Sequence, residues 1–477
     1  MALSLRRRLL AEIRSCERLA AVLENDGSPR CAVGNASPLT AKDCGARVSA
    51  DSMLGSASPM SLRAITVENY RCFCEPMRLE LRPLTLLYGP NNAGKSTAAG
   101  LIELLGRSVA ASARAPLDSS ADLGYRDLVW RPAETKPGAL RFALEWDDSA
   151  CNRAPLRARW RLDLDRDRDR MYVRELELVG GVEDLHLKAN RDAGPEMYIR
   201  RGSGAEEAPL RIPFRGLVPH SDEPALAALS ERLRALEGCC AWIGGDRVHP
   251  PRMIPFDAPV PLALRGDGAG ATELLLHPQA EALLAAVGAW YARPEIRRRL
   301  IKREVTDKNR QLLLNPPPSA RFDVPLADAG AGMGQILPVL TAIAQAKERT
   351  AAGADVLELL AIEEPESQLH PDAQRALGDW IVDQMRADPS PRLILETHSR
   401  VLIMTIQLAL ARGLLDPARV GVYWLEQRET GSTYAAQIEF DRFGRPDSQW
   451  PSDVFADELE LAELLTEEQI DRGAWDE

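Results

Sequence analysis

The chain has 477 residues, of which 45% are hydrophobic, 27% are charged and 5% are aromatic. These fractions exclude wholesale disorder, and the length allows two or three domains or one large α/β domain that carries insertions. The formal net charge of −11 excludes a polycation that coats nucleic acid over its whole surface, although a local basic groove is still compatible with it.

Cysteine usage and hydropathy indicate the compartment. The eight cysteines form no CxxC pair and no zinc-type spacing with histidine, which predicts reduced thiols. The longest uncharged stretches are shorter than the roughly 20 residues that a membrane helix needs. Glu12, Arg14 and Glu17 interrupt the apolar core that a signal peptide requires. We therefore expect a soluble, cytoplasmic protein with no membrane partner.

The first 59 residues have the character of an appendage. Residues 1–27 show the Leu/Ala/Arg spacing of an amphipathic helix, whereas residues 28–59 are dominated by Gly, Ser, Ala and Pro without a period. A segment of the second composition cannot bury enough apolar surface to fold and is typical of a linker. The sequence therefore predicts an N-terminal helix plus a flexible linker over 1–59.

Short β segments begin at Leu62. The stretches 62–73 and 77–88 carry alternating or continuous apolar residues, and the residues after Gly94 have helical spacing. Alternation returns between about 138 and 215. Within it, the run 163–170 (DLDRDRDR) predicts a solvated hairpin tip rather than a metal site, because Arg neighbours each Asp.

The remaining patterns place helices and buried strands. Helical spacing predicts helices over 224–240 and 279–303, while 355–364 and 391–397 are continuous apolar runs that end in polar residues. Such runs are typical of buried parallel strands, which place functional residues at their carboxyl ends. The sequence has no internal repeat and no sustained heptad, so a solenoid and a long coiled coil are excluded.

Residues 89–96 match the phosphate-binding pattern GxxxxGK[ST]. In this pattern the glycines let backbone N–H groups surround phosphates, Lys95 neutralises the β and γ oxygens, and the Ser96 hydroxyl ligates Mg²⁺. An apolar run precedes the loop and helical spacing follows it, as the motif needs. Lysine is scarce, with seven Lys against 52 Arg, yet Lys95 stands at the required position. The predicted binding residues are Gly89, Pro90, Asn91, Asn92, Ala93, Gly94, Lys95, Ser96 and Thr97.

Two adjacent carboxylates follow the apolar run that ends at Ile362. Hydrolysis at a phosphate loop needs a carboxylate for Mg²⁺ and a base for water. We predict that Glu363, with Ser96, ligates the metal and that Glu364 polarises the attacking water, whereas Glu366 is a structural or interface residue. The alternative is a strand that ends in a solvated acidic turn.

The next apolar run ends in Glu396, Thr397, His398 and Ser399. We predict that His398 senses the γ-phosphate, which makes Lys95, Glu364 and His398 the predicted catalytic residues. The alternative is a polar cap of the following helix, since Thr397 and Ser399 are good N-cap residues.

Taken together, these segments resemble one family, the ABC-type branch of AAA ATPases, which is related to RecF, the SMC proteins and the overcoming-lysogenization-defect (OLD) ATPases. The segments that carry the resemblance are 69–73, 89–97, 362–366, 369–371 and 396–399. The stretch 328–338 (DAGAGMGQILP) is similar to the degenerate signature motif of this branch. The stretches 243–247 and 450–455 also resemble its recurring segments.

The resemblance implies an α/β fold: a P-loop NTPase of ABC-ATPase type with a mixed central sheet, a β-rich lobe and a helical insertion between phosphate loop and signature. It implies an N-terminal part of the ATPase domain at 60–130 and a β-rich and helical insertion at 131–320. The C-terminal part, with signature, acidic pair and switch histidine, is implied at 321–477.

In that family the signature of one subunit closes over the nucleotide held by another, so that two ATP molecules lie in a head-to-tail dimer interface. The resemblance implies that Gly332, Gly334 and Gln335 donate hydrogen bonds to the partner's γ-phosphate, and that Arg71 lies near the nucleotide. The chain departs from the family pattern at three points. Gly334 replaces the signature serine, Glu363 replaces the usual aspartate, and no clear Q-loop glutamine follows the phosphate loop.

The function implied is that of an ATP-binding and hydrolysing switch with Mg²⁺, a homodimer or higher homo-oligomer that controls a separately encoded effector, a nuclease or toxin. By analogy the setting is a bacterial antiphage system such as Septu or PARIS. Two alternatives stay open. One is a RecF/SMC-like DNA repair or maintenance ATPase that clamps DNA with the basic segments 157–161 or 297–303, and the other is a non-hydrolysing nucleotide-sensing scaffold.

Overall fold

The computed structural model describes residues 62–119, 123–131, 138–147, 155–166, 168–201, 209–315, 322–351, 358–387 and 391–451. The chain divides into two compact units, and the described residues up to Trp450 belong to the unit Ala57–Trp450. The helix and linker predicted over 1–59 lie outside the described residues, as does most of the segment 450–455.

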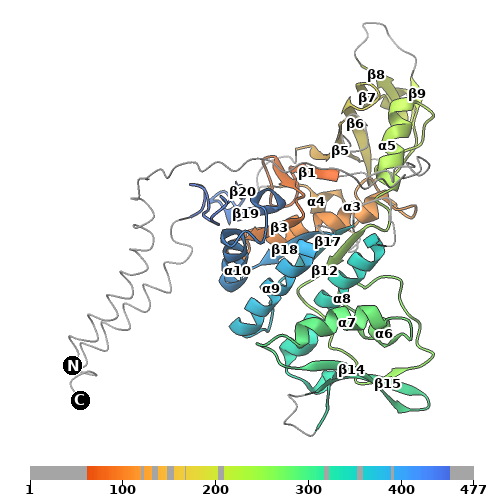
Figure 1. Cartoon of the computed structure of the whole chain (residues 1–477). Helices are drawn as coiled ribbons and strands as arrows, with labels where there is room; N and C mark the ends of the chain where they lie inside the picture. Colours follow the sequence, from red (N-terminus) through yellow and green to blue (C-terminus); the bar gives the residue numbers. More distant parts are fainter. Residues whose placement is uncertain are drawn as a thin grey trace, which may run out of the picture. The chain divides into compact units, whose positions relative to one another are not determined.

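A six-stranded sheet forms the centre of the unit, with the strand order β12-β17-β18-β3-β19-β20 (Figure 1). The first five strands run parallel, and β20 pairs antiparallel with β19, so the sheet is mixed as predicted. The apolar runs that predicted buried parallel strands form β17 and β18. The strands are β12 (Cys240–Ile243), β17 (Leu359–Glu363), β18 (Arg392–Thr397), β3 (Leu84–Tyr88), β19 (Val420–Gln427) and β20 (Thr433–Ile438).

Both faces of this sheet are covered, since every residue from Leu359 to Ile362 is buried. Side chains alternate between the faces of a strand. Leu359 and Ala361 therefore face the cluster that contains Leu101 and Leu105 of α3, while Leu360 and Ile362 face the opposite layer. The helices around the sheet are α2 (Lys95–Ala99), α3 (Leu101–Val109), α8 (Ala331–Ala351), α9 (Pro371–Ala387) and α10 (Arg400–Ala411).

A second, eight-stranded antiparallel sheet forms the β-rich lobe, with the order β2-β1-β4-β5-β6-β7-β8-β9. Its buried residues alternate with exposed or half-buried ones, as in β4, because one face packs into the apolar core. The charged run 163–170 closes the β5–β6 hairpin, which confirms the predicted hairpin tip. The strands are β2 (Met77–Glu80), β1 (Leu62–Glu68), β4 (Leu140–Trp146), β5 (Leu156–Asp165), β6 (Arg170–Gly180), β7 (Leu185–Ala189), β8 (Met197–Arg200) and β9 (Leu210–Arg211).

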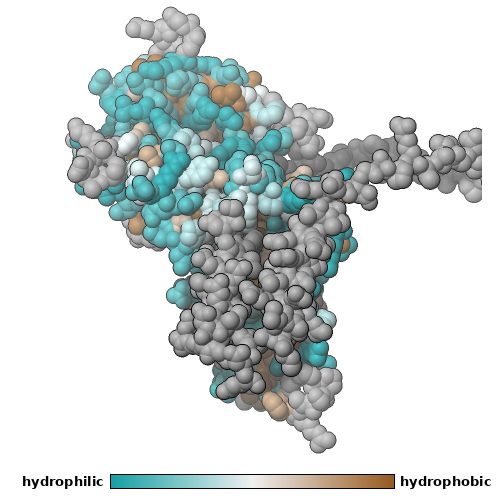
Figure 2. Space-filling view, turned by 90° about the vertical axis from the view of Figure 1, so that its left-hand side faces the viewer, coloured by the Kyte–Doolittle hydropathy of each residue, from teal (hydrophilic) through white to brown (hydrophobic). Residues whose placement is uncertain are grey.

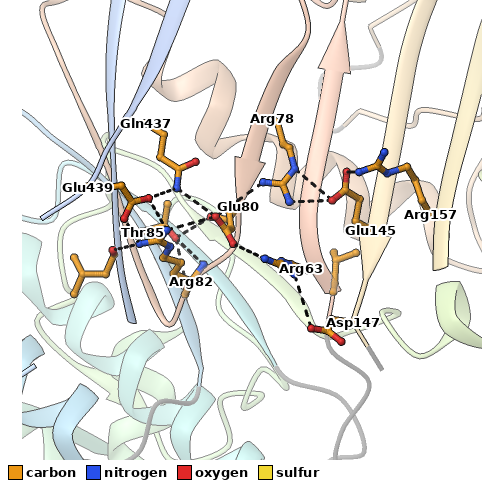
Figure 3. A network of polar contacts seen from close by, with 12 residues as sticks. Arg63, Arg78, Glu80, Arg82, Thr85, Glu145, Asp147, Arg157, Gln437 and Glu439 are labelled. Carbon is orange, nitrogen blue, oxygen red and sulfur yellow. Dashed lines mark hydrogen bonds and ion pairs between the residues drawn. The ribbon is translucent and has the colours of Figure 1, made fainter. Parts of the chain in front are cut away.

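A network of charged side chains connects the two sheets (Figure 3). Glu80 of β2 accepts a hydrogen bond of 3.2 Å from Nε2 of Gln437 on β20. Arg82 pairs with Glu439 at 2.6 Å and also contacts Glu80 at 3.6 Å. The backbone N–H of Glu80 donates to the hydroxyl of Tyr423 at 2.8 Å. These contacts fix the start of β3, and hence the loop that follows it, against both sheets.

The stretch between the lobe and α8 holds a small four-stranded sheet and two helices, α6 (Ala271–Leu276) and α7 (Glu281–Tyr291). The prediction of a helix over 279–303 is wrong beyond Tyr291. Arg297 adopts a φ of 54°, which ends helical geometry, and β14 then pairs with β15, where Leu312, Leu313 and Leu314 are buried. The strands are β13 (Ile254–Pro255), β14 (Arg299–Thr306), β15 (Asn309–Asn315) and β16 (Val324–Pro325).

The remaining elements are short. The helix predicted over 224–240 is α5 (Pro224–Arg234), and it ends earlier than expected because Cys240 already belongs to β12. The others are α4 (Tyr125–Leu128), β10 (Phe214–Arg215), β11 (Val218–Pro219) and the 3₁₀ turns η3 (Arg191–Ala193), η4 (Leu326–Asp328) and η5 (Pro417–Arg419).

The described surface is largely hydrophilic on the face shown in Figure 2, with apolar residues in small groups. Leu262 and Phe322 are the most exposed large apolar side chains outside the lobe among the described residues, at 95% and 65%. None of the described helices combines the length and the hydropathy that crossing a membrane requires.

Candidate nucleotide-binding site

The phosphate-loop residues 89–94 connect β3 to α2 at the carboxyl end of the parallel strands, so the predicted strand–loop–helix arrangement is present. Gly94 has a φ of 86°, and a Cβ at this residue would lie 2.6 Å from Sγ of Cys72. Both the conformation and the space therefore require glycine. Asn92 also has a left-handed φ, 62°, and donates weakly to Gln427 at 3.4 Å.

Lys95 and Ser96 begin α2 and point into the same site. Lys95 is 3% exposed, and its Nζ donates to the carbonyl oxygen of Pro90 at 2.6 Å. Burial lowers the pKa of Lys95, while the nearby Glu396, Glu364 and Glu366 oppose that change. Ser96 Oγ donates to Oε1 of Glu396 at 2.8 Å. The ammonium thus lies in the mouth of its own loop, where phosphate oxygens would replace the carbonyl.

Glu363 lies at the end of β17 and is held from the β12 side. Its Oε1 accepts a hydrogen bond of 3.0 Å from the indole Nε1 of Trp242. Burial raises the pKa of Glu363, and the hydrogen bonds from Trp242 and from the backbone of Gly245 oppose this. The carboxylate is therefore anchored on the side of β17 that faces away from β3.

Glu364 and His398 face each other, with 3.9 Å between Oε1 and Nε2. Glu364 has a φ of 42°, and its side chain is 45% exposed, so that it projects from the strand end toward solvent. Burial lowers the pKa of His398, with a further contribution from Lys95 that Glu364 opposes. The imidazole is therefore held in its neutral form near neutral pH.

The cap of α10 is Ser399, whose Oγ accepts from the N–H of Leu402 at 2.9 Å. His398 is therefore not the cap of this helix. Glu366 supports the same turn: its Oε1 accepts from Thr397 Oγ1 at 2.7 Å, from the N–H of His398 at 2.9 Å and from that of Ser399. This geometry agrees with the structural role expected for Glu366.

Glu396 lies at the end of β18, a direct neighbour of β3, and its carboxylate contacts Ser96. The strand register pairs Glu396 with Leu87 of β3 on one side and with Glu363 of β17 on the other. The residue is 3% exposed, and its Oε2 has no hydrogen-bond partner. Burial raises the pKa of Glu396 to about 7, although the hydrogen bond from Ser96 opposes this.

The signature-like residues form the start of α8, next to the turn after Glu364. A Cβ at Gly332 would lie 2.3 Å from the carbonyl oxygen of Gln368, so only glycine fits. A Cβ at Gly334 would lie 3.0 Å from Pro250, which leaves little room for the serine of the family pattern. Gln335 Nε2 donates to the carbonyl oxygen of Arg247 at 2.8 Å, within the same protomer.

Arg247 connects α8 to the acidic turn. It is 4% exposed, and its guanidinium donates to the carbonyl oxygens of Glu363, Glu364 (2.7 Å) and Gly244 (3.0 Å). A cleft of about 470 Å³ opens at this place. Its lining consists of Gly245, Asp246, Ala331, Gln335, Glu363, Glu364, Ser367 and Gln368. The structure thus brings the start of α8 and the acidic pair of one protomer to a common cleft.

Arg71 lies in the turn 69–73, which packs on the phosphate loop. Its N–H donates to Leu128 at 2.8 Å, and the neighbouring Cys72 contacts the Gly94 position. The Arg71 side chain is exposed at this edge. The structure therefore places the turn that carries Arg71 beside the phosphate loop, and the proximity of the Arg71 side chain to a nucleotide stays a prediction.

The residues fit a divalent cation together with phosphates. Within the described ranges, no group of three or more His, Cys, Asp or Glu side chains is arranged as metal ligands. Mg²⁺, however, is usually held by one or two carboxylates plus water and substrate phosphates. The hydroxyl of Ser96 and the partnerless Oε2 of Glu396 provide oxygen ligands of that kind.

Three residues of this site received no role from the sequence. Glu396 stands in a quoted motif, and its only signal is an acidic residue at the end of a buried apolar run. Arg247 ends the quoted stretch 243–247, to which no task was assigned, and Trp242 lies just before that stretch. Their contacts join segments that are 300, 117 and 121 residues apart.

Two family profiles match the chain. One, described as "AAA ATPase domain", matches residues 60–121, which include the phosphate loop. The other, described as "AAA domain, putative AbiEii toxin, Type IV TA system", matches residues 291–404, which include the start of α8, the acidic pair and His398. The matched segments are thus similar to AAA ATPase domains, and they carry the phosphate loop and the acidic pair that meet at one edge of the mixed central sheet.

Solved structures of SMC head domains are similar to this chain. The SMC head domain from Thermotoga maritima is 12% identical and covers 80% of this chain and 100% of its own, with a TM-score of 0.41. A Pyrococcus furiosus Smc head domain with an extended coiled coil, bound to the C-terminal domain of ScpA, is 9% identical over 80% of this chain and 96% of its own, with a TM-score of 0.44. No curated protein matches the chain.

Proposed function

We propose that this chain binds and hydrolyses ATP with Mg²⁺ and acts as a molecular switch. The observation that carries the proposal is the convergence of four side chains at one edge of the central sheet. Lys95 lies in the phosphate loop, Ser96 lies beside a buried carboxylate, and Glu364 faces His398 at 3.9 Å. These groups come from three adjacent strand ends, where parallel sheets place their ligands.

Each side chain has a distinct task in this proposal. The loop backbone and Lys95 hold the β- and γ-phosphates, and Ser96 and Glu363 hold the cation. Mg²⁺, when bound, offsets the negative charge of the phosphate oxygens. Glu364 is exposed enough to contact a water molecule and accepts its proton, while the neutral His398 donates a hydrogen bond to the γ-phosphate.

We propose that two protomers dimerise head to tail around ATP, with Gly332, Gly334 and Gln335 of one facing the nucleotide of the other. Support comes from the resemblance and from the position of α8, whose first N–H groups point away from the helix body. The side-chain amide of Gln335 donates to the carbonyl oxygen of Arg247 in its own protomer. This hydrogen bond has to break before the amide can donate to a phosphate. Arg71 lies beside the loop and contacts the nucleotide.

The output of the switch is control of a separately encoded effector, a nuclease or toxin, in bacterial antiphage defence. The description of the profile that matches residues 291–404 names a toxin of a Type IV TA system, which agrees in kind with such a setting. The net charge of −11 also suits a protein partner. The compartment that we propose is the cytoplasm.

The described structure does not favour the alternative of a DNA clamp. Arg157, Arg159 and Arg161 pair across strands with Glu145, Glu177 and Glu175, at 2.7, 3.1 and 3.5 Å. Lys302 pairs with Glu281 at 3.0 Å, and Arg303 pairs with Asp323. The arginines of 157–161 are therefore paired with acidic side chains, as are Lys302 and Arg303 of the second segment, which reduces the attraction of these side chains for phosphates.

The proposal is tested by ATP turnover and by light scattering on the purified full chain. We expect Lys95→Ala to abolish nucleotide binding, and Glu364→Gln to bind ATP, lose turnover and shift the protein to a larger assembly. Lys308→Ala, an exposed lysine far from the loop in sequence, is the matched control. Absence of both turnover and an ATP-dependent change in size in the wild type would contradict the proposal. A wild type that changes size with ATP but shows no turnover would support the alternative of a non-hydrolysing scaffold.

A further inference from the structure

Glu396 is closer to the phosphate loop than the carboxylate that motif reasoning assigns to the metal. β18 is the direct neighbour of β3, whereas β17 is one strand further away. Neighbouring strands lie about 4.8 Å apart. The backbone of Glu363 is thus separated from β3 by about twice that spacing, while Glu396 is separated by one.

The contact between Ser96 and Glu396 has the geometry that a cation site needs. The hydroxyl of Ser96 donates a hydrogen bond of 2.8 Å to Oε1 of Glu396. A hydroxyl oxygen that donates still has lone pairs, and these stay available for a metal. The same contact places the Ser96 hydroxyl oxygen next to the Glu396 carboxylate, so that two kinds of oxygen ligand lie side by side.

The second oxygen of Glu396 requires an explanation. Oε2 is buried and has no hydrogen-bond partner, and the whole residue is 3% exposed. Burying a carboxylate oxygen without a partner is costly, and native structures rarely leave such an atom without a role. A divalent cation bound between Ser96 and Oε2 would offset this cost.

Glu363 is positioned differently. Its Oε1 is engaged by Trp242 at 3.0 Å on the β12 side, away from β3. The indole orients this carboxylate and leaves it one oxygen for other contacts. Glu363 is therefore placed to contact the cation from β17, on the side opposite to β3.

We propose that Glu396 is a direct carboxylate ligand of the Mg²⁺ that Ser96 ligates, in addition to Glu363. The inference rests on the proposed function, because the cation is the one that accompanies ATP. The structure thereby assigns a metal-binding role to the residue two positions before His398, and it places both on one strand end. Glu396 then contacts the cation, and His398, two residues later in the same turn, contacts the γ-phosphate.

The test is Mn²⁺ binding to the full chain with a non-hydrolysable ATP analogue, followed by electron paramagnetic resonance of free Mn²⁺. Glu396→Gln keeps an oxygen that accepts from Ser96 but removes the charge. We expect it to lower Mn²⁺ affinity tenfold or more, while affinity for the analogue in EDTA stays within about twofold. Glu348→Gln, an exposed carboxylate on α8, is the matched control and should change neither quantity.

The outcomes are separable. Mn²⁺ affinity of Glu396→Gln within twofold of the wild type overturns the inference, and so does an equal loss of analogue affinity in EDTA, which would indicate a structural role. If Glu396→Gln does not fold, Glu396→Asp keeps the charge and retracts it by one methylene, and unchanged Mn²⁺ affinity there also overturns the inference. A wild type that binds no nucleotide, with or without Mn²⁺, refutes the proposed function itself.

Discussion

Arg247 donates a hydrogen bond of 2.7 Å to the carbonyl oxygen of Glu364, the residue to which we assign water activation. Its own carbonyl oxygen accepts from Gln335 at 2.8 Å. One buried guanidinium therefore connects the start of α8 to the acidic turn within a protomer. A movement of α8 against a second subunit would reach the backbone of Glu364 through this side chain.

Replacement of Arg247 by methionine should therefore affect both stability and turnover. The change leaves the carbonyl oxygens of Gly244, Glu363 and Glu364 without their donor, and an unpaired buried group costs about 1–3 kcal/mol. We expect the free energy of unfolding to fall by about 3 kcal/mol, measured by urea denaturation, and ATP turnover to fall at least tenfold at saturating ATP. Arg252→Met, whose side chain is 62% exposed, is the control. Unchanged turnover in Arg247→Met would refute the coupling.

His398→Ala should separate binding from turnover. The imidazole lies 3.9 Å from Glu364, and its burial keeps the pKa low and the ring neutral. Loss of a hydrogen bond to developing phosphate charge typically costs roughly 10²-fold in rate. We expect a loss of this size in kcat, while ATP affinity by fluorescence titration changes little. His220→Ala, an exposed histidine, should behave as the wild type. Equal losses of affinity and kcat would assign His398 to binding instead.

Gly332→Ala should disturb the contact between α8 and the turn after Glu364. The added Cβ would lie 2.3 Å from the backbone oxygen of Gln368, which cannot move without shifting the turn. Overpacking of this kind typically costs about 1–3 kcal/mol. Gly330→Ala is a close control, because a Cβ there meets nothing within 4 Å. Thermal unfolding of both variants checks the expectation, and equal melting temperatures would contradict it.

Glu358 should make stability depend on pH. Burial raises the pKa of Glu358 to about 7, although Arg349 contacts it at 2.8 Å. Since the folded state holds this proton more tightly than the unfolded state, whose Glu titrates near 4.3, Glu358 favours the fold at low pH. That contribution is lost as the pH rises toward and through 7.

Glu358→Gln should remove this dependence. Relative to the variant, the wild type should lose about 2 kcal/mol of unfolding free energy between pH 5 and pH 8. Urea denaturation at several pH values measures the difference between the two proteins. Glu348→Gln, on the exposed side of α8, should follow the wild type at every pH. Parallel curves for Glu358→Gln and the wild type would refute the expectation.

Local patterns predicted a large part of the fold. The alternation that predicted the lobe strands and the apolar runs that predicted β17 and β18 reflect burial on one face and on both faces of a strand. Periodicity failed at 299–303, where arginines spaced as in a helix form β14. Pairing with the apolar β15 decides that segment, and such pairing cannot be read from the segment itself.

The sequence by itself determined the groups that are contiguous in the chain: the phosphate loop around Lys95, the pair Glu363 and Glu364, and His398 after its apolar run. Such motifs are readable because one short turn fixes their geometry. Only the tertiary structure decided which carboxylate lies against Ser96, because strand order, not sequence distance, sets that neighbour. The anchoring of Glu363 by Trp242 and the position of Arg247 likewise depend on β12 joining the sheet beside β17.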